Sequence, residues 1–139
     1  MRRSLLGATL CAMLLACGHE PPKPAALVPE DVCAMCKMAV SRASFAAQLA
    51  MPNGEALMFD DLGCLLDDAR RDSARAAWVA DYDSRAWVAL DSCWLVHSDS
   101  VRTPMGGGWL AYADSARAAK SAVEWHGVIT RGRDRWHRR

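Results

Sequence analysis

The order of apolar and polar residues in the first half of the chain predicts three strands and a helix. Phe, Ala, Leu and Met occupy every second position over 45–51, Pro-Asn-Gly follows, and an apolar run returns over 56–59, which is typical of a β-hairpin. Apolar residues then recur at helical spacing over 60–72, behind aspartates that can cap a helix. A short apolar run at 78–82 predicts a third strand. The expected order is β-β-α-β.

The second half of the chain repeats this pattern. Asp114 can cap its helix at the N-terminus, and Gly127 can end that helix at the C-terminus. Asp60 and Asp114 follow corresponding strands at a spacing of 54 residues. The expected strand, strand, helix and final strand cover 93–97, 107–113, 114–126 and 128–130. We therefore predict an α+β fold of two small ββαβ units, formed by an internal duplication.

The N-terminus has the pattern of a lipoprotein signal peptide. Arg2 and Arg3 precede about twelve mostly apolar residues, too few to span a bilayer. The run ends in Leu-Leu-Ala-Cys, which resembles a lipoprotein cleavage site and makes Cys17 the predicted lipidated residue behind a signal peptide at 1–16. The alternative is an ordinary secretory peptide that is cut nearby. Gly18, in place of an aspartate, favours the outer membrane, with the protein facing the periplasm.

The mature chain is expected to hold one small domain between two polar segments. A proline-rich tether covers 17–30, the folded domain 31–130 and a basic tail 131–139. For this tail we favour a solvated, frayed end over a site for anionic membrane or an acidic partner. Removing Arg2 and Arg3 from the 17 basic residues leaves 15 against 16 acidic ones. A chain so close to neutral has no general attraction to nucleic acid.

Four cysteines follow the predicted anchor, and two of them lie only three residues apart. In an exported protein two structural disulfides are the ordinary expectation for Cys33, Cys36, Cys64 and Cys93. A disulfide between Cys33 and Cys36 would close a very small loop and would remove little entropy from the unfolded chain. This spacing therefore indicates a chemical role for the close pair.

The segment Cys-Ala-Met-Cys-Lys-Met offers thiolates and thioethers within six residues. Soft sulfur ligands of this kind select copper(I). A turn can bring Cys33 and Cys36 together, Met38 can share a face with Cys36, and the positive charge of Lys37 favours thiolates. Met105, in a loop rich in proline and glycine, is a further soft donor that is poorly placed for core packing.

Three other interpretations compete with a copper site. A dithiol redox centre uses Cys-x-x-Cys, but it normally follows a strand and begins a helix, and no strand is expected before Cys33. A zinc ribbon needs a second cysteine pair or a histidine pair, whereas Cys64 and Cys93 stand alone. The methionines could also be core filler, although their density beside two cysteines argues against it.

Four motifs in order resemble the NosL family, accessory lipoproteins of nitrous-oxide reductase that act as copper(I) chaperones. The resemblance covers nearly the whole mature domain, and it implies two ββαβ units and a lipid anchor. The motifs are Cys33-x-x-Cys36-x-Met38, Phe59-Asp60-Asp61-Leu62-Gly63-Cys64, Trp78-Val79-Ala80-Asp81-Tyr82 and Thr103-Pro104-Met105-Gly106.

The resemblance implies a metal site of Cys33, Cys36, Met38 and Met105. Lys37 replaces a glycine that is usual in the family. Ala34 and Met35 stand where members often carry a histidine, so Met35 is a candidate substitute.

Several neighbouring residues have ordinary explanations. Asp60 and Asp61 can cap the first helix, Cys64 can be a small buried thiol, and His97 can be a surface histidine. Whether Met35, Cys64 or His97 joins the site, and whether Cys64 and Cys93 pair, stays open at this point.

The resemblance implies a copper carrier rather than an enzyme. Its expected partners are a copper donor and a recipient copper enzyme, such as nitrous-oxide reductase, or that enzyme's assembly machinery, with the membrane reached through the lipid anchor. The alternative function is an extracytoplasmic dithiol-disulfide redox protein that uses Cys33 and Cys36.

Overall fold

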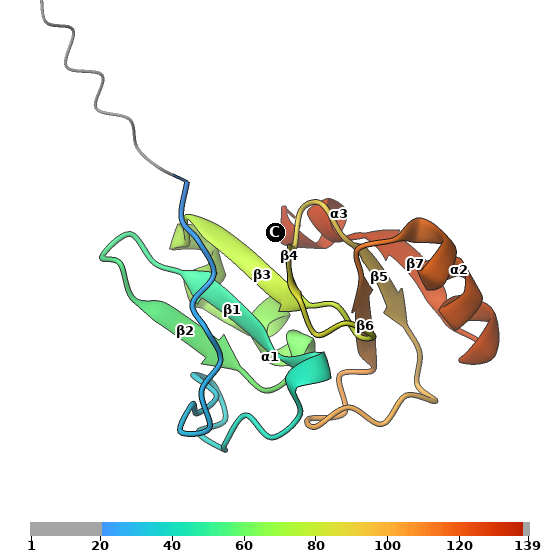
Figure 1. The fold of residues 1–139 in the computed structure, drawn as a ribbon, viewed down its shortest axis with the longest axis horizontal. Coiled ribbons are helices and arrows are strands. Elements are labelled where there is room, and N and C mark those ends of the chain that lie inside the picture. Colours follow the sequence, from blue (N-terminus) through green and yellow to red (C-terminus); the bar gives the residue numbers. More distant parts are fainter. Residues whose placement is uncertain (1–20, 138–139) are drawn as a thin grey trace, which may run out of the picture.

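A computed structural model describes residues 21–137 of the chain. Figure 1 shows two sheets side by side, each with helices packed against it. The predicted signal peptide at 1–16 and the predicted lipidation site Cys17 lie outside the described residues. None of the helices in 21–137 is long and apolar enough to cross a membrane.

The first sheet has four antiparallel strands in the order β2-β1-β3-β4. The hairpin predicted from the alternating pattern is confirmed, since β1 and β2 pair from Ala47 with Phe59 to Ala50 with Ala56. Helix α1 follows β2 and contacts β1, β2 and also β6 of the second sheet, so it lies where the two sheets meet. The elements are β1 (Ala47–Ala50), β2 (Ala56–Phe59), α1 (Leu62–Asp67), β3 (Ala76–Ala80) and β4 (Trp87–Ala89).

The second sheet has three antiparallel strands in the order β6-β5-β7, and helix α2 packs against all three. In both halves the first strand of the unit is central, and the strand after the helix lies on its other side. The repeated order is what a duplication would leave, and the duplication itself stays a prediction. The elements are β5 (Trp94–His97), β6 (Trp109–Tyr112), α2 (Ser115–Glu124) and β7 (Val128–Arg131).

The first helix is shorter than its apolar spacing predicts. It ends at Asp67, and a 3₁₀ helix covers Ala69–Ser73. The carboxylate of Asp68 accepts a hydrogen bond from the backbone N–H of Arg70. An aspartate that binds the backbone two residues on competes with the helical hydrogen-bond ladder. The expectation of one continuous helix over 60–72 is therefore wrong.

The end of α2 also differs from expectation. His126, not Gly127, takes the left-handed conformation after the helix, with a φ of 51°. Gly127 instead lies against β5: a Cβ there would be 2.7 Å from the Cγ1 of Val96 and 2.9 Å from the carbonyl oxygen of His97. The glycine is thus required for close packing, and its N–H still closes the helix on Ala122.

The basic C-terminal segment is folded along part of its length. Arg131 belongs to β7, and Gly132–Trp136 forms helix α3. Trp136 packs against the core, and the guanidinium of Arg135 lies 4.6 Å from the centre of the Trp109 ring. A frayed tail over 131–139 is therefore not what the described residues show.

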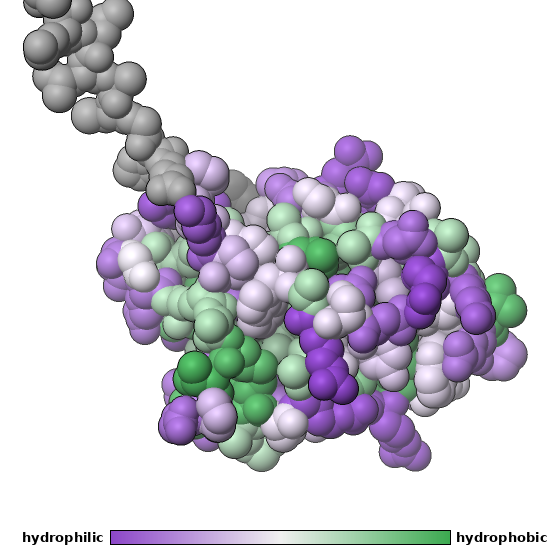
Figure 2. Space-filling model, viewed as in Figure 1, coloured by the Kyte–Doolittle hydropathy of each residue, from purple (hydrophilic) through white to green (hydrophobic). Residues whose placement is uncertain are grey.

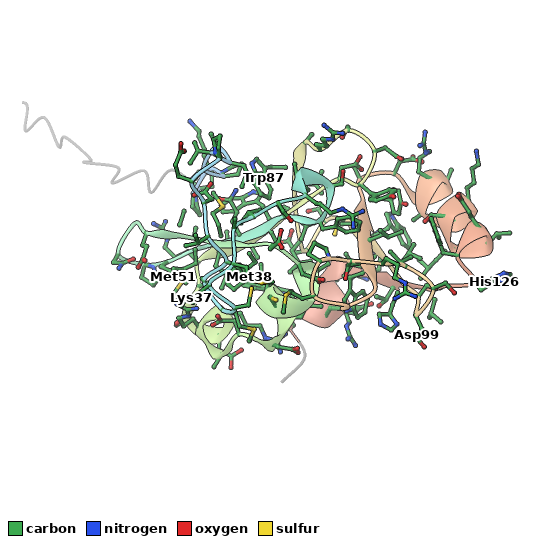
Figure 3. All side chains as sticks on the ribbon, turned by 90° about the horizontal axis from the view of Figure 1, so that it is seen from below. Lys37, Met38, Met51, Trp87, Asp99 and His126 are labelled. Atoms are coloured by element: carbon green, nitrogen blue, oxygen red, sulfur yellow. The ribbon has the colours of Figure 1, made fainter. Side chains whose placement is uncertain are left out.

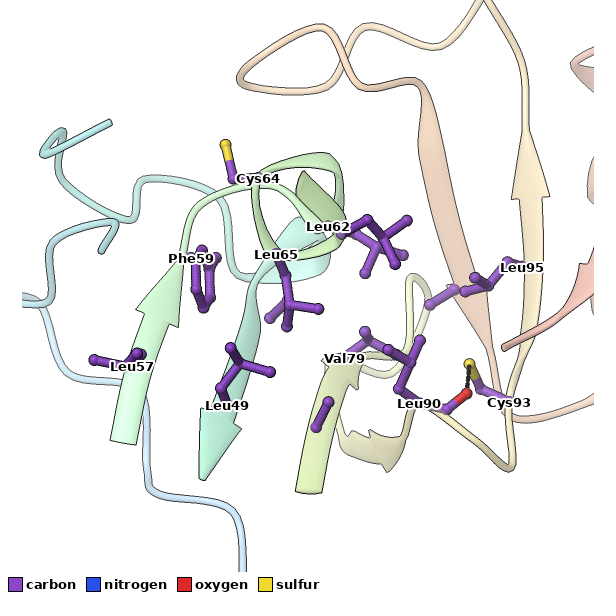
Figure 4. Packing of buried hydrophobic residues seen from close by; sticks show 14 of the residues in the cluster. Leu49, Leu57, Phe59, Leu62, Cys64, Leu65, Val79, Leu90, Cys93 and Leu95 are labelled. Atoms are coloured by element: carbon purple, nitrogen blue, oxygen red, sulfur yellow. Dashed lines mark hydrogen bonds between the residues drawn. The ribbon is translucent and has the colours of Figure 1, made fainter. Parts of the chain in front are cut away.

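One apolar core spans both sheets. Leu49, Phe59 and Leu65 from the first unit join Leu90 and Leu95 from the second half of the chain, and all five are fully buried. Figure 4 shows the leucines converging between the sheets. A second, smaller cluster lies under α2. Because one core bridges the sheets, elements far apart in sequence hold fixed positions beside one another.

Candidate metal centre

The first two cysteines lie on a tight loop that closes on itself. Val32 and Ala39 form an isolated antiparallel bridge. Within it, the N–H of Cys33 donates to the carbonyl oxygen of Met38 at 2.7 Å, and the N–H of Lys37 donates to that of Cys33 at 2.9 Å. Lys37 closes the turn in the left-handed region at φ 65°. A residue with a Cβ costs about 1–2 kcal/mol in this conformation, so the lysine is unfavourable for the backbone at this position.

Two hydrogen bonds attach this loop to the first sheet. The N–H of Ala34 donates to the carbonyl oxygen of Met58 in β2 at 2.7 Å. Further along, the buried carboxylate of Asp60 accepts from the N–H of Ser41 at 2.8 Å. The loop therefore lies beside the end of β2, where the chain enters α1. Figure 3 shows Lys37 and Met38 on this side of the molecule, away from His126 at the end of α2.

This position brings a third cysteine to the pair. The sulfur atoms of Cys33, Cys36 and Cys64 all lie within 4.8 Å of one another. Cys64 is in the first turn of α1, and Figure 4 shows its sulfur pointing away from Leu65 and the leucine packing. Among residues 21–137, no other group of three cysteine, histidine or acidic side chains converges in this way. We call these three residues the thiol cluster.

The cysteines of the thiol cluster are free thiols with divergent proton affinities. Burial opposes the thiolate of Cys33, but the N–H groups of Cys36, Asp60 and Met35 outweigh it and lower the pKa of Cys33 from its ordinary value. Burial and the neighbouring Cys33 raise the pKa of Cys64 to about 12. In the free cluster Cys33 thus gives up its proton more readily than Cys64.

Positive side chains lie on the outer side of the loop. The carbonyl oxygen of Ala34 accepts from the ammonium of Lys37 at 2.7 Å and from the guanidinium of Arg70 at 3.2 Å. Asp68 keeps Arg70 in place through an ion pair of 2.6 Å, which is also the main reason that the pKa of Asp68 is lowered. Both cations favour thiolates in the loop.

A buried carboxylate joins the thiol cluster to the second half of the chain. Asp61 caps α1 through the N–H of Gly63 at 2.7 Å. Its other oxygen accepts from the hydroxyl of Thr103 at 2.5 Å, from the N–H of Met105 at 3.0 Å and from that of Gly107 at 3.4 Å. Asp61 therefore fixes the loop that carries Met105 to the first turn of the helix that carries Cys64.

Two glycines make this contact possible. A Cβ on Gly107 would lie 2.6 Å from an oxygen of Asp61, and a Cβ on Gly63 would lie 3.1 Å from the Cα of Gly107. A Cβ on Gly106 would meet no atom within 4 Å, and this glycine instead supplies a positive φ of 75°. The absence of a side chain at Gly107 therefore lets this loop approach α1 closely.

The structure places the predicted donors in two groups. Cys33 and Cys36 meet in the thiol cluster. Met38 and Met105 are 49% and 43% exposed. Met38 follows Cys36 by two residues, and Met105 lies on the loop that Asp61 holds. Coordination of a metal by Met38 and Met105 therefore stays a prediction.

The structure distinguishes the residues whose membership of the site the sequence left open. Cys64 joins the pair. The ring of His97 packs against Trp109 at an interplanar angle of 48°, with centroids 4.5 Å apart, outside the thiol cluster. Cys93 is buried, donates to the carbonyl oxygen of Leu90 and forms no disulfide with Cys64. The signal that could have found Cys64 is its place one turn after a strand end that carries two consecutive aspartates.

Three converging thiols suit one soft metal ion. Metal–thiolate bonds of about 2.3 Å place three sulfurs around one ion about 4 Å apart. The observed limit of 4.8 Å is close enough for small side-chain rotations to close it. Structural zinc takes four nitrogen, sulfur or carboxylate ligands, and the thiol cluster offers three with thioethers nearby. The donor set therefore favours a soft metal ion such as copper.

Comparison with known proteins identifies the family and the fold. The NosL family model matches residues 24–134. The crystal structure of the copper chaperone NosL from Shewanella denitrificans superposes with a TM-score of 0.70 and 18% sequence identity, over 80% of this chain and 94% of that chain. At this identity the likeness establishes the fold. No curated protein matches the chain significantly.

Proposed function

The chain belongs to the NosL family, and from that premise we propose that it is a copper(I) chaperone whose binding site centres on Cys33, Cys36 and Cys64. The convergence of three sulfur atoms within 4.8 Å carries the proposal. A dithiol redox protein needs only the first two of them. The third thiol favours a metal as the group that the cluster holds.

Met38 and Met105 are proposed as thioether donors that complete or guard the site. A thioether binds copper(I) without adding charge. It therefore supports the ion and can be displaced more easily than a thiolate. Such a mixed set suits a carrier, which must bind copper and also release it.

The proposed activity is transfer by ligand exchange, without catalysis of a chemical reaction. Copper would come from a donor protein and pass to a copper enzyme or its assembly machinery, with nitrous-oxide reductase as the family expectation. Loading of apo-nitrous-oxide reductase by the copper-bound protein, compared with free copper(I) at the same buffered activity, measures this step. Equal rates with both copper sources would count against delivery to that enzyme.

We also propose that the domain at 31–130 is held at the membrane by lipid on Cys17, through the tether at 17–30. The proposed location of the protein is the outer membrane, with the domain facing the periplasm. Mass spectrometry of the membrane fraction should find acyl chains on Cys17, and Cys17→Ser should release the protein. A wild-type protein recovered in soluble form with an unmodified N-terminus would contradict the anchor.

Anaerobic titration with copper(I) against a competing chelator tests the site. One equivalent should bind tightly. Replacing any cysteine of the thiol cluster by serine should weaken binding by about a hundredfold, because a charged soft ligand is lost. Met105→Ala or Met38→Ala should weaken it by about tenfold. Cys93→Ser is the matched control, since this buried thiol lies outside the cluster, and it should leave the affinity unchanged.

The same variants separate the rival function. A dithiol redox protein would reduce a test disulfide with dependence on Cys33 and Cys36 alone. Measurable disulfide turnover, together with copper affinity that is unchanged in the Cys64, Met38 and Met105 variants, would replace the chaperone assignment by the redox one.

A further inference from the structure

The three thiols of the cluster differ in how firmly the fold holds them. Cys33 is fully buried, and both its N–H and its carbonyl oxygen are hydrogen-bonded within the loop. Cys64 is 6% exposed and stands on the first turn of a capped helix. Cys36 is only partly buried. Two of the thiols therefore belong to buried residues on fixed supports, and the third belongs to a residue that keeps some contact with solvent.

The surface around Cys36 is unusually apolar. Val32, Met35, Met38 and Met105 are each between 42% and 53% exposed, and they belong to the two loops that meet at the site. Figure 2 shows strongly hydrophobic surface over the N-terminal loop, next to charged surface. Methionine side chains are flexible and polarizable, so they adapt to different partners. Three of these four residues also offer a soft sulfur at the face where Cys36 is reached.

We propose that Cys36 is the ligand through which copper(I) enters and leaves, whereas Cys33 and Cys64 hold the ion until the last step. The proposal rests on the proposed copper-binding function. In the exchange, a thiolate or thioether of the partner forms a bond to copper as the bond to the Cys36 sulfur breaks. The electron pair stays on that sulfur, which takes a proton from water, and copper remains in the +1 state throughout.

The exposed methionines beside Cys36 line the path by which the partner's ligand approaches. An incoming soft ligand reaches copper past the half-exposed side chains of Met35 and Met38. It does not need to open the buried side of the cluster, where Cys33 and Cys64 are packed against the core. Exchange at Cys36 therefore requires no unfolding of α1 or of the loop.

Alkylation of the cysteine that dissociates first from copper tests the order in which the three thiolates release the ion. The full-length protein, as matured by its host, is loaded with one copper(I) under anaerobic conditions and treated with N-ethylmaleimide for increasing times. Peptide mapping then identifies the modified cysteines. When copper is bound all three cluster thiols are deprotonated, so access rather than proton affinity decides the rate. Cys36 should be modified about tenfold faster than Cys33 or Cys64. Native mass spectrometry should find a singly modified species that still carries copper.

Cys93 serves as the internal control because it is buried and outside the cluster. Modification of Cys33 or Cys64 at the rate of Cys36, with Cys93 untouched, would overturn the proposal. So would modification of all four cysteines together, since release would then follow global unfolding. Failure of the protein to take up copper at all would instead remove the proposed function itself, which separates the two outcomes.

Discussion

Helices α1 and α2 each follow an aspartate N-cap, yet the two carboxylates have different partners. Asp114 is exposed, and the one hydrogen bond that its carboxylate accepts among the described residues comes from the N–H of Arg117 in its own helix. Asp61 is fully buried, caps α1 and also binds three donors from the loop at 103–107. The same local device thus caps one helix in one half and joins the two halves in the other.

The two buried thiols show a similar contrast. Burial raises the pKa of both Cys64 and Cys93 to about 12. Cys93 donates to a carbonyl oxygen and, within residues 21–137, joins no cluster of thiols, whereas Cys64 meets Cys33 and Cys36. Burial and pKa alone therefore do not distinguish a ligand from a packed thiol. The difference lies in what the rest of the fold brings to each sulfur.

The largest difference in stability is expected between variants that lack one or the other N-cap aspartate. Asp61→Ala leaves four donors without an acceptor, in a buried site, and should lower the free energy of unfolding by about 3–5 kcal/mol. Asp114→Ala should cost about 1 kcal/mol. Urea denaturation measures both, and copper titration of the folded protein should show weaker binding only in the Asp61 variant. Equal losses in the two variants would show that Asp61 is no more than a helix cap.

The two thiols can be compared through the pH dependence of copper affinity. Because the Cys64 thiol has a pKa of about 12, it is protonated between pH 6 and 8 and must lose its proton to bind copper. Affinity should therefore rise with pH, by about tenfold per unit for each proton displaced.

Cys64→Ser should reduce that slope by about tenfold per pH unit and lower the affinity at pH 7 by about a hundredfold. Cys93→Ser should change neither quantity, because its thiol keeps its proton. Affinity measured at several pH values with a chelator of known protonation behaviour provides the test. An unaltered slope in Cys64→Ser would mean that this thiol is not a ligand.

Substitution of two neighbouring glycines in the Met105 loop compares the effect of a steric clash with the effect of an unfavourable backbone conformation. Gly107→Ala places a Cβ 2.6 Å from Asp61, so it should cost about 2 kcal/mol and move the loop away from α1. Gly106→Ala meets no neighbour and should cost about 1 kcal/mol through its positive φ alone. Thermal or urea unfolding gives the stabilities, and copper affinity should fall only with Gly107→Ala. A larger loss at Gly106 would contradict the close contact.

The smallest effect is expected at the left-handed residues. Lys37→Gly and Arg85→Gly both relieve a positive φ, at 65° and 63°, and each should raise stability by up to about 1 kcal/mol. Lys37 also donates to the Cys-x-x-Cys loop, so its removal should weaken copper binding slightly, whereas Arg85→Gly should not. Identical copper affinities in the two variants would limit the role of Lys37 to the backbone.

Local sequence patterns determined the elements of this protein and the most conspicuous part of its site. The alternation at 45–59 specifies the β1–β2 hairpin, and the aspartates before each helix mark where α1 and α2 begin, because these signals depend only on near neighbours. The Cys-x-x-Cys spacing likewise placed Cys33 and Cys36 together, since a single turn brings them into contact.

The membership of Cys64 was decided only in three dimensions. It stands 28 residues beyond Cys36 in the sequence and reaches the pair because the N-terminal loop is hydrogen-bonded to β2 and to Asp60. The approach of the Met105 loop through Asp61 was likewise decided only in three dimensions, as was the partial exposure of Cys36 beside two buried cysteines. Each depends on packing between segments distant in the sequence, and no local periodicity records such packing.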